Sequence, residues 1–180
     1  MDMDWQPTMT WQVAKQRAEL LKQIRSFFDG KGLVEVETPV LCNSTVTDVH
    51  LDAIHAQFDW SEKGRITQYL QTSPEYAMKR LLASGYQSIY QICKAYRNES
   101  QGRFHNPEFS MLEWYRIDFS VDELIKEVAE LLSTVLGTVT FETYSYQEVF
   151  LEHTSIDPLL SKEAVSYTHL DAADEEDSVD

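Results

Sequence analysis

The sequence contains few cysteine and histidine residues, two and five respectively. Its two cysteines, Cys42 and Cys93, do not form a CxxC pair, so we expect both to be reduced and structural. His50 and His55 lie close together but have no cysteine partner, which makes a zinc site at this spacing unfavourable. We therefore predict no metal ligands within this chain.

Long apolar runs are also lacking. No stretch of about 18 apolar residues occurs, and the N-terminus does not show the charged-then-apolar pattern of a signal segment. A length of 180 residues fits one domain with a core of ordinary size. These features predict a soluble cytoplasmic protein with no membrane partner.

Basic residues are scarce relative to acidic ones. The chain has 15 Lys and Arg against 30 Asp and Glu, which gives a net charge of −15 at pH 7. Nonspecific nucleic-acid binding depends on neutralising phosphates with basic side chains, so this balance disfavours tRNA as a partner. The argument is mild, because a local basic patch can coexist with a net negative charge.

The acidic residues are concentrated at the C-terminus. Residues 166–180 include a run of Asp and Glu but no Lys or Arg, and they show no core periodicity. We expect residues 161–180 to lie outside the core as a disordered or non-native acidic tail. The segment resembles a translated adapter sequence, and a genuine acidic tail is the alternative.

Hydrophobic periodicity predicts an α+β fold, in which helices flank an antiparallel sheet. Ser120 with Glu123 and Ser145 with Glu148 have the spacing of capping boxes, which predicts a helix start at each serine. The helices are expected at 10–30, 75–83, 120–136 and a short stretch from 145, and the strands at 33–36, 51–60, 65–72, 88–99 and 108–117.

The most informative stretch is the last strand pair with its connecting loop. If 88–99 and 108–117 are antiparallel partners, the alternation of side chains brings charged and aromatic residues onto one face. Buried charge is unfavourable unless it is paired, so a bound ligand is one explanation; ordinary cross-strand ion pairs on the surface are the other. The residues concerned are Arg97, Glu99, Phe109, Glu113 and Tyr115.

Three stretches resemble motifs of class II aminoacyl-tRNA synthetases, in the form used by the lysyl subgroup. Gly32–Pro39 resembles motif 1, which forms a helix and a strand of the dimer interface in that family. Gln71–Tyr76 followed by Lys79–Leu81 resembles the segment that receives the amino acid, and Arg97–Tyr115 resembles motif 2. The resemblance covers about residues 11 to 160 and implies the N-terminal half of such a catalytic domain, in a homodimer.

The resemblance assigns the ATP site to motif 2. Arg97 would be the catalytic residue, because a guanidinium can bridge the α-phosphate of ATP and the carboxylate of the amino acid. Glu99 would accept a hydrogen bond from the adenine amino group, and Phe109 would stack on the ring. For each loop residue, exposure without a role is the alternative. The ATP-binding set is Arg97, Asn98, Glu99, Arg103, His105, Asn106 and Phe109.

The same resemblance assigns the amino-acid site. Lysine carries two ammonium groups, so its pocket requires carboxylates. Glu75 would pair with the backbone-type ammonium, while Glu113 and Tyr115 would line the side-chain pocket. The substrate-binding set is Ser73, Pro74, Glu75, Glu113 and Tyr115.

Motif 3 of the family, a glycine-rich strand and helix with an ATP-binding arginine, does not occur in the sequence. We therefore expect residues 1–160 to be a partial catalytic domain that is inactive alone. A further acidic residue for lysine, and the ligands of Mg²⁺, are expected from the other half of the domain.

The segment before motif 1 separates two kinds of lysyl enzyme. Lysyl-tRNA synthetases carry an OB-fold domain there, whereas this sequence has one predicted helix. The arrangement resembles the stand-alone lysyl paralogues, which activate lysine or β-lysine with ATP and transfer it to a lysine side chain of elongation factor P. The alternatives are a truncated lysyl-tRNA synthetase that charges tRNA and a non-catalytic dimerisation fragment.

Overall fold

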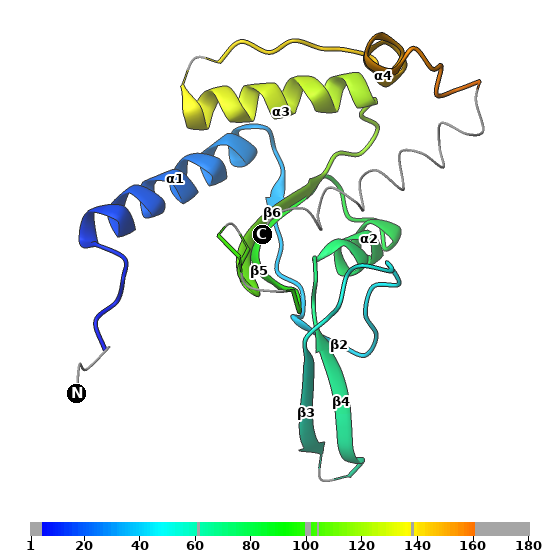
Figure 1. Ribbon diagram of the computed structural model, residues 1–180. Coiled ribbons are helices and arrows are strands. Elements are labelled where there is room, and N and C mark those ends of the chain that lie inside the picture. The colour runs from blue at the N-terminus through cyan, green and yellow to red at the C-terminus, as the bar shows by residue number, and fades with distance from the viewer. Residues whose placement is uncertain (1–4, 61, 100–101, 104, 138, 161–180) are drawn as a thin grey trace. The chain divides into compact units, whose positions relative to one another are not determined.

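The computed structural model describes residues 5–60, 62–99, 102–103, 105–137 and 139–160 (Figure 1). The chain divides into two compact units, residues 1–138 and residues 139–180. The expected acidic tail, residues 161–180, lies outside the described residues, so its character stays a prediction. No helix in the described part of the chain is both long enough and apolar enough to cross a membrane.

The first unit holds three helices and six strands among its described residues. The second contains the short helix α4 (Tyr146–Thr154). The elements of the first unit are α1 (Trp11–Gly30), β1 (Val34–Glu35), β2 (Leu41–Cys42), β3 (His55–Trp60), β4 (Gly64–Leu70), α2 (Glu75–Ala83), β5 (Ile89–Tyr96), β6 (Glu108–Tyr115) and α3 (Val121–Leu136).

The strands of the first unit form two three-stranded sheets, in the orders β1-β5-β6 and β2-β4-β3. The β5–β6, β2–β4 and β3–β4 pairs are antiparallel, whereas β1 runs parallel to β5. Helices and mainly antiparallel strands confirm the predicted α+β class. Parallel strands cannot be joined by a tight hairpin, and the long connection between β1 and β5 permits this parallel pair.

Helix boundaries follow the local signals in the sequence. Thr10 caps α1, with its hydroxyl accepting from Val13 N at 3.3 Å. Both predicted capping boxes are present, at Ser120 for α3 and at Ser145 for α4. Such caps satisfy backbone N–H groups that have no partner in the first turn of a helix.

The predicted strand 88–99 is too long, since β5 ends at Tyr96. The amide of Arg97 still donates to Pro107 O across the pair at 3.0 Å, but the Asn98 amide donates to Asp52 O at 2.8 Å. The chain therefore leaves the strand pair at Asn98. Only part of motif 2 lies in regular sheet, and the rest lies in a loop.

The core lies between one face of the first sheet and two helices, α1 and α3 (Figure 1). Phe28 of α1 is fully buried, and its ring stacks on Tyr90 of β5 with centroids 4.7 Å apart. Leu131 of α3 and the partly buried Trp114 of β6 complete this cluster. One face of the β5–β6 pair is thus apolar and covered, and the candidate site residues of β6 lie on the other face.

Candidate active site

The register of β5 and β6 determines which side chains share the candidate site. Glu113 lies opposite Gln91, Met111 opposite Cys93, and Phe109 opposite Ala95. Opposed residues project on the same face, so Phe109 and Glu113 lie on one surface of the strand pair, as the alternation predicted. Phe109 and Glu113 are four positions apart along β6, which corresponds to a distance of about 13 Å.

Arg97 directly follows β5, and its guanidinium lies against an aromatic ring. Its Cζ atom lies 5.2 Å from the centre of the Phe109 ring, and Nη1 lies 4.0 Å from Oε1 of Glu99. The Nε atom is buried and has no hydrogen-bond partner among the residues that the structure describes. An unpaired buried donor is unfavourable, and a hydrogen bond to an anionic ligand would satisfy it. The structure thus brings Arg97, Glu99 and Phe109 together as predicted.

The other predicted ATP-binding residues lie in or beside the loop between β5 and β6. Asn98, Arg103, His105 and Asn106 are all exposed. The loop is closed by two backbone hydrogen bonds between Gly102 and His105, at 3.2 and 3.3 Å. Contacts of these side chains with ATP phosphates or adenine stay predictions.

The predicted amino-acid site includes the start of α2. Pro74 is fully buried and precedes Glu75, the first residue of the helix, whose amide donates to the Ser73 hydroxyl at 3.4 Å. Lys79, one turn later, places its Nζ 2.5 Å from Oε1 of Glu75. The Glu75 carboxylate holds the pKa of the Lys79 ammonium above its usual value. This contact was not predicted from the sequence, although a Glu followed four positions later by a Lys is a known signal for a helical ion pair.

Glu113 and Tyr115 form the other part of the predicted amino-acid site. The Tyr115 hydroxyl donates to Oε1 of Glu113 at 2.7 Å. Burial raises the pKa of the half-buried Glu113 carboxyl, and the negative charge of Glu75 raises it further. The Tyr115 hydrogen bond and the Lys79 ammonium lower that pKa. Glu75, Lys79 and Glu113 are therefore electrostatically coupled, and we call these three residues the acidic cluster.

The acidic cluster has chemistry suited to a cation. Two carboxylates share one protein ammonium, so a net negative charge remains beside a partly desolvated glutamate. A substrate ammonium can offset this charge with charge-assisted hydrogen bonds. At the other end of the strand pair, Arg97 and Phe109 offer a guanidinium and an aromatic face, which suit a phosphate and a planar base.

A cavity of about 610 Å³ lies beside β1 and β5, and its lining includes Gln91 and Cys93, which lie opposite Glu113 and Met111 of β6. It is lined by Arg25, Glu35 and Lys94 among others, and by none of the predicted site residues. Within the described parts of the chain, no group of three or more His, Cys, Asp or Glu side chains could hold a metal ion. The expected Mg²⁺ ligands therefore stay a prediction.

Comparison with known proteins supports the resemblance inferred from the motifs. A family model described as tRNA synthetases class II (D, K and N) matches residues 2–178. The elongation factor P–(R)-β-lysine ligase of Photobacterium profundum is 49% identical over 160 residues, which cover 88% of this chain and 50% of that protein. The protein of the same name from Histophilus somni (strain 2336) is 48% identical over 184 residues, covering 98% of this chain and 57% of that protein.

The fold also matches a solved structure. Asparaginyl-tRNA synthetase from Pyrococcus horikoshii, crystallised with asparaginyl-adenylate, superimposes with a TM-score of 0.58 at 22% identity. The match covers 68% of this chain and 27% of that one. The chain spans about half the length of the curated relatives that it matches. From the family match and the fold, the chain belongs to the class II tRNA synthetases of the D, K and N group.

Proposed function

We propose that this chain forms part of a ligase that activates lysine or β-lysine with ATP and transfers it to a lysine side chain of elongation factor P. The names of its relatives support this proposal at 48–49% identity. The observation that carries it within this chain is the acidic cluster, in which Glu113 is partly desolvated and coupled to Glu75. A pocket of this kind favours a substrate with an extra ammonium group.

The first step is formation of an aminoacyl-adenylate. A carboxylate oxygen of the substrate attacks the α-phosphorus of ATP, and pyrophosphate leaves with the electrons of the broken P–O bond. Arg97 supports this step, since its guanidinium can bind the two anions that must approach each other. Phe109 holds the guanidinium on one side and would present its ring to adenine.

The second step transfers the acyl group. The side-chain amine of an elongation factor P lysine attacks the acyl carbon, an amide bond forms, and AMP leaves as the amine loses a proton. Glu75, Glu113 and Tyr115 would hold the ammonium groups of the substrate during both steps, while Ser73 and Pro74 fix the start of α2 that carries Glu75. Holding the acyl group in one geometry reduces the entropy lost on reaching the transition state.

Mg²⁺ would neutralise charge on the ATP phosphates when bound. The described residues include no cluster of three or more His, Cys, Asp or Glu side chains that could hold it. We propose Glu99, Asn98, Asn106, Arg103 and His105 as further contacts to ATP, on the basis of their motif 2 positions. We also propose a homodimer, because motif 1 forms the dimer interface in the family that the sequence resembles.

The proposal is tested with the longest gene product that contains this sequence. We expect ATP–pyrophosphate exchange that depends on lysine or β-lysine, and transfer of radiolabelled lysine to elongation factor P. The control substrate is elongation factor P with its target lysine changed to arginine, which should not be labelled. Labelling of that control would contradict the proposed acceptor, and charging of tRNA in its place would support a lysyl-tRNA synthetase.

A further inference from the structure

A buried carboxylate lies on α3, away from the acidic cluster. Glu127 is 2% exposed and lies one helical turn before Leu131, on the same face of α3. Leu131 packs in the core. A buried charge destabilises the fold unless it is paired and hydrogen-bonded. The residues that pair with Glu127 therefore show which elements its carboxylate links.

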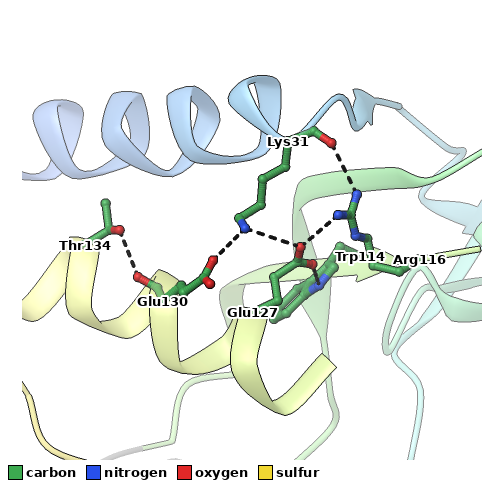
Figure 2. Close-up of polar contacts among 6 residues, drawn as sticks. All are labelled: Lys31, Trp114, Arg116, Glu127, Glu130 and Thr134. Carbon is green, nitrogen blue, oxygen red and sulfur yellow. Dashed lines mark hydrogen bonds and ion pairs between the residues drawn. The ribbon is translucent and has the colours of Figure 1, made fainter. Parts of the chain in front are cut away.

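Glu127 connects α3 to the end of β6 and to the end of α1 (Figure 2). Its Oε1 accepts from Trp114 Nε1 at 3.1 Å, and its Oε2 lies 3.1 Å from Arg116 Nη2. Lys31 Nζ lies 3.9 Å from the same Oε2. Arg116 also donates through Nη1 to Lys31 O at 3.3 Å, just after α1.

These contacts hold β6 from the face opposite to the acidic cluster. Trp114 and Arg116 flank Tyr115, and Trp114 directly follows Glu113. Successive side chains of a strand point to opposite faces, so a shift of residues 114 and 116 also shifts residues 113 and 115. The carboxylate of Glu127 therefore restrains the two substrate-pocket residues without contacting them.

We propose that Glu127 is a positioning residue for the amino-acid pocket. It fixes the end of β6 so that the Glu113 carboxylate and Tyr115 hydroxyl, 2.7 Å apart, face the substrate ammonium together. The proposal deepens the proposed function and depends on it. If Glu127 only stabilised the fold, changing it would affect lysine binding and ATP binding equally. If Glu127 positions Glu113 and Tyr115, changing it affects lysine binding selectively.

Glu130 provides a matched control on the same helix. Its side chain is 59% exposed, and its Oε2 lies 2.6 Å from Lys31 Nζ, so it shares one partner with Glu127. Its described side-chain contact is with Lys31, just after α1, and its backbone carbonyl accepts from Thr134 of α3; no contact with β6 is described. The control therefore removes a neighbouring negative charge while leaving β6 held.

The test compares Glu127→Gln, Trp114→Phe and Glu130→Gln in the longest gene product that contains this sequence. Exchange between ATP and pyrophosphate yields KM for lysine and KM for ATP separately. We expect Glu127→Gln and Trp114→Phe to raise KM for lysine about tenfold and to change KM for ATP less than about twofold. Glu130→Gln should change neither. In a Glu113→Gln background, Glu127→Gln should add little, because the residue that it positions is already altered.

Equal changes in both KM values, or no change, would overturn the positioning role. If Glu127→Gln does not fold, the Trp114→Phe variant alone must show the selective rise in KM for lysine, and its absence would overturn the proposal. Additive effects of Glu127→Gln and Glu113→Gln would do the same. Failure of the unmodified protein to catalyse any lysine-dependent exchange would instead refute the proposed function, and this inference with it.

Discussion

The change of Glu113 to glutamine tests the amino-acid site most directly. Glutamine keeps the size of the side chain and an oxygen that can accept from Tyr115, so the fold around β6 should be retained. The negative charge is lost. A difference in lysine binding between the unmodified protein and Glu113→Gln therefore measures the effect of the negative charge at residue 113.

The size of the effect follows from the environment of Glu113. A hydrogen bond to a charged group contributes about 1.5–3 kcal/mol, and Glu113 is partly desolvated, which strengthens its interaction with an ammonium. Since about 1.4 kcal/mol corresponds to a factor of ten, KM for lysine should rise about 10- to 100-fold in Glu113→Gln. KM for ATP should change less than about twofold, because Phe109 lies about 13 Å along the strand.

The raised pKa of Glu113 predicts how lysine binding and folding stability each change with pH. Burial and Glu75 raise this pKa, so the carboxyl gains a proton at a higher pH than an ordinary glutamate. In the proposed site, lysine binding requires the charged form of Glu113 and should weaken as the pH falls through the raised pKa. The free energy of unfolding has the opposite pH dependence. Because the pKa of Glu113 is raised in the folded state, its contribution to stability is fully present below its unfolded-state pKa and is lost as the pH rises through its folded-state pKa.

Measurement of KM for lysine by exchange, at several pH values, checks both expectations. The unmodified protein should lose lysine affinity on acidification, and Glu113→Gln should lose this part of the pH dependence. Tyr115→Phe serves as the matched control, because loss of the hydroxyl donor removes an interaction that lowers the Glu113 pKa. The affinity loss should then begin at a higher pH. Equal effects of Glu113→Gln on lysine and ATP would refute the assignment of this residue to the lysine pocket.

Three further changes test other parts of the structure. Arg97→Lys should reduce exchange at saturating lysine at least about 100-fold, because an ammonium lacks the planar fork of the guanidinium that lies over Phe109; near-normal exchange would contradict the catalytic role. Phe28→Ala should lower the free energy of unfolding by about 3–5 kcal/mol in urea titrations, since the ring is fully buried, and a loss below about 1 kcal/mol would contradict this packing. Ser120→Ala should lower it by about 1 kcal/mol through loss of the capping box, and no change would show that the cap contributes nothing.

Features that depend on local interactions could be predicted from the sequence. The capping serines of α3 and α4 act on residues three positions away, and the bounds of α2 depend on Pro74 and the residues that follow it. The shared face of Phe109 and Glu113 follows from alternation along one strand. These predictions were confirmed because their physical causes lie within a few residues of each other.

Features that depend on distant contacts could not be predicted in this way. The parallel pairing of β1 with β5 joins residues more than fifty positions apart, and the two-residue strand β2 has no periodicity of its own. The end of β5 is determined by the bond from Asn98 to Asp52, which no local pattern indicates. The ion-pair partners of Glu127 lie just after α1 and just after β6, so its proposed role could not be predicted without the structure.

The two acidic groups on either side of β6 differ in how their charge is balanced. Behind the strand, Glu127 lies within ion-pair distance of two protein cations, Arg116 and Lys31, so its charge is balanced within the fold, while its buried Oε2 has no hydrogen bond among the described residues. In front of the strand, Lys79 pairs with Glu75 and also lowers the pKa of Glu113, so among the described residues two carboxylates face one ammonium. A partly desolvated carboxylate without a full complement of protein cations is stabilised by a cationic ligand. Charge balance therefore favours the proposed assignment, with the Glu113 side as the binding face and the Glu127 side as its support, even though both carboxylates lie beside the same strand.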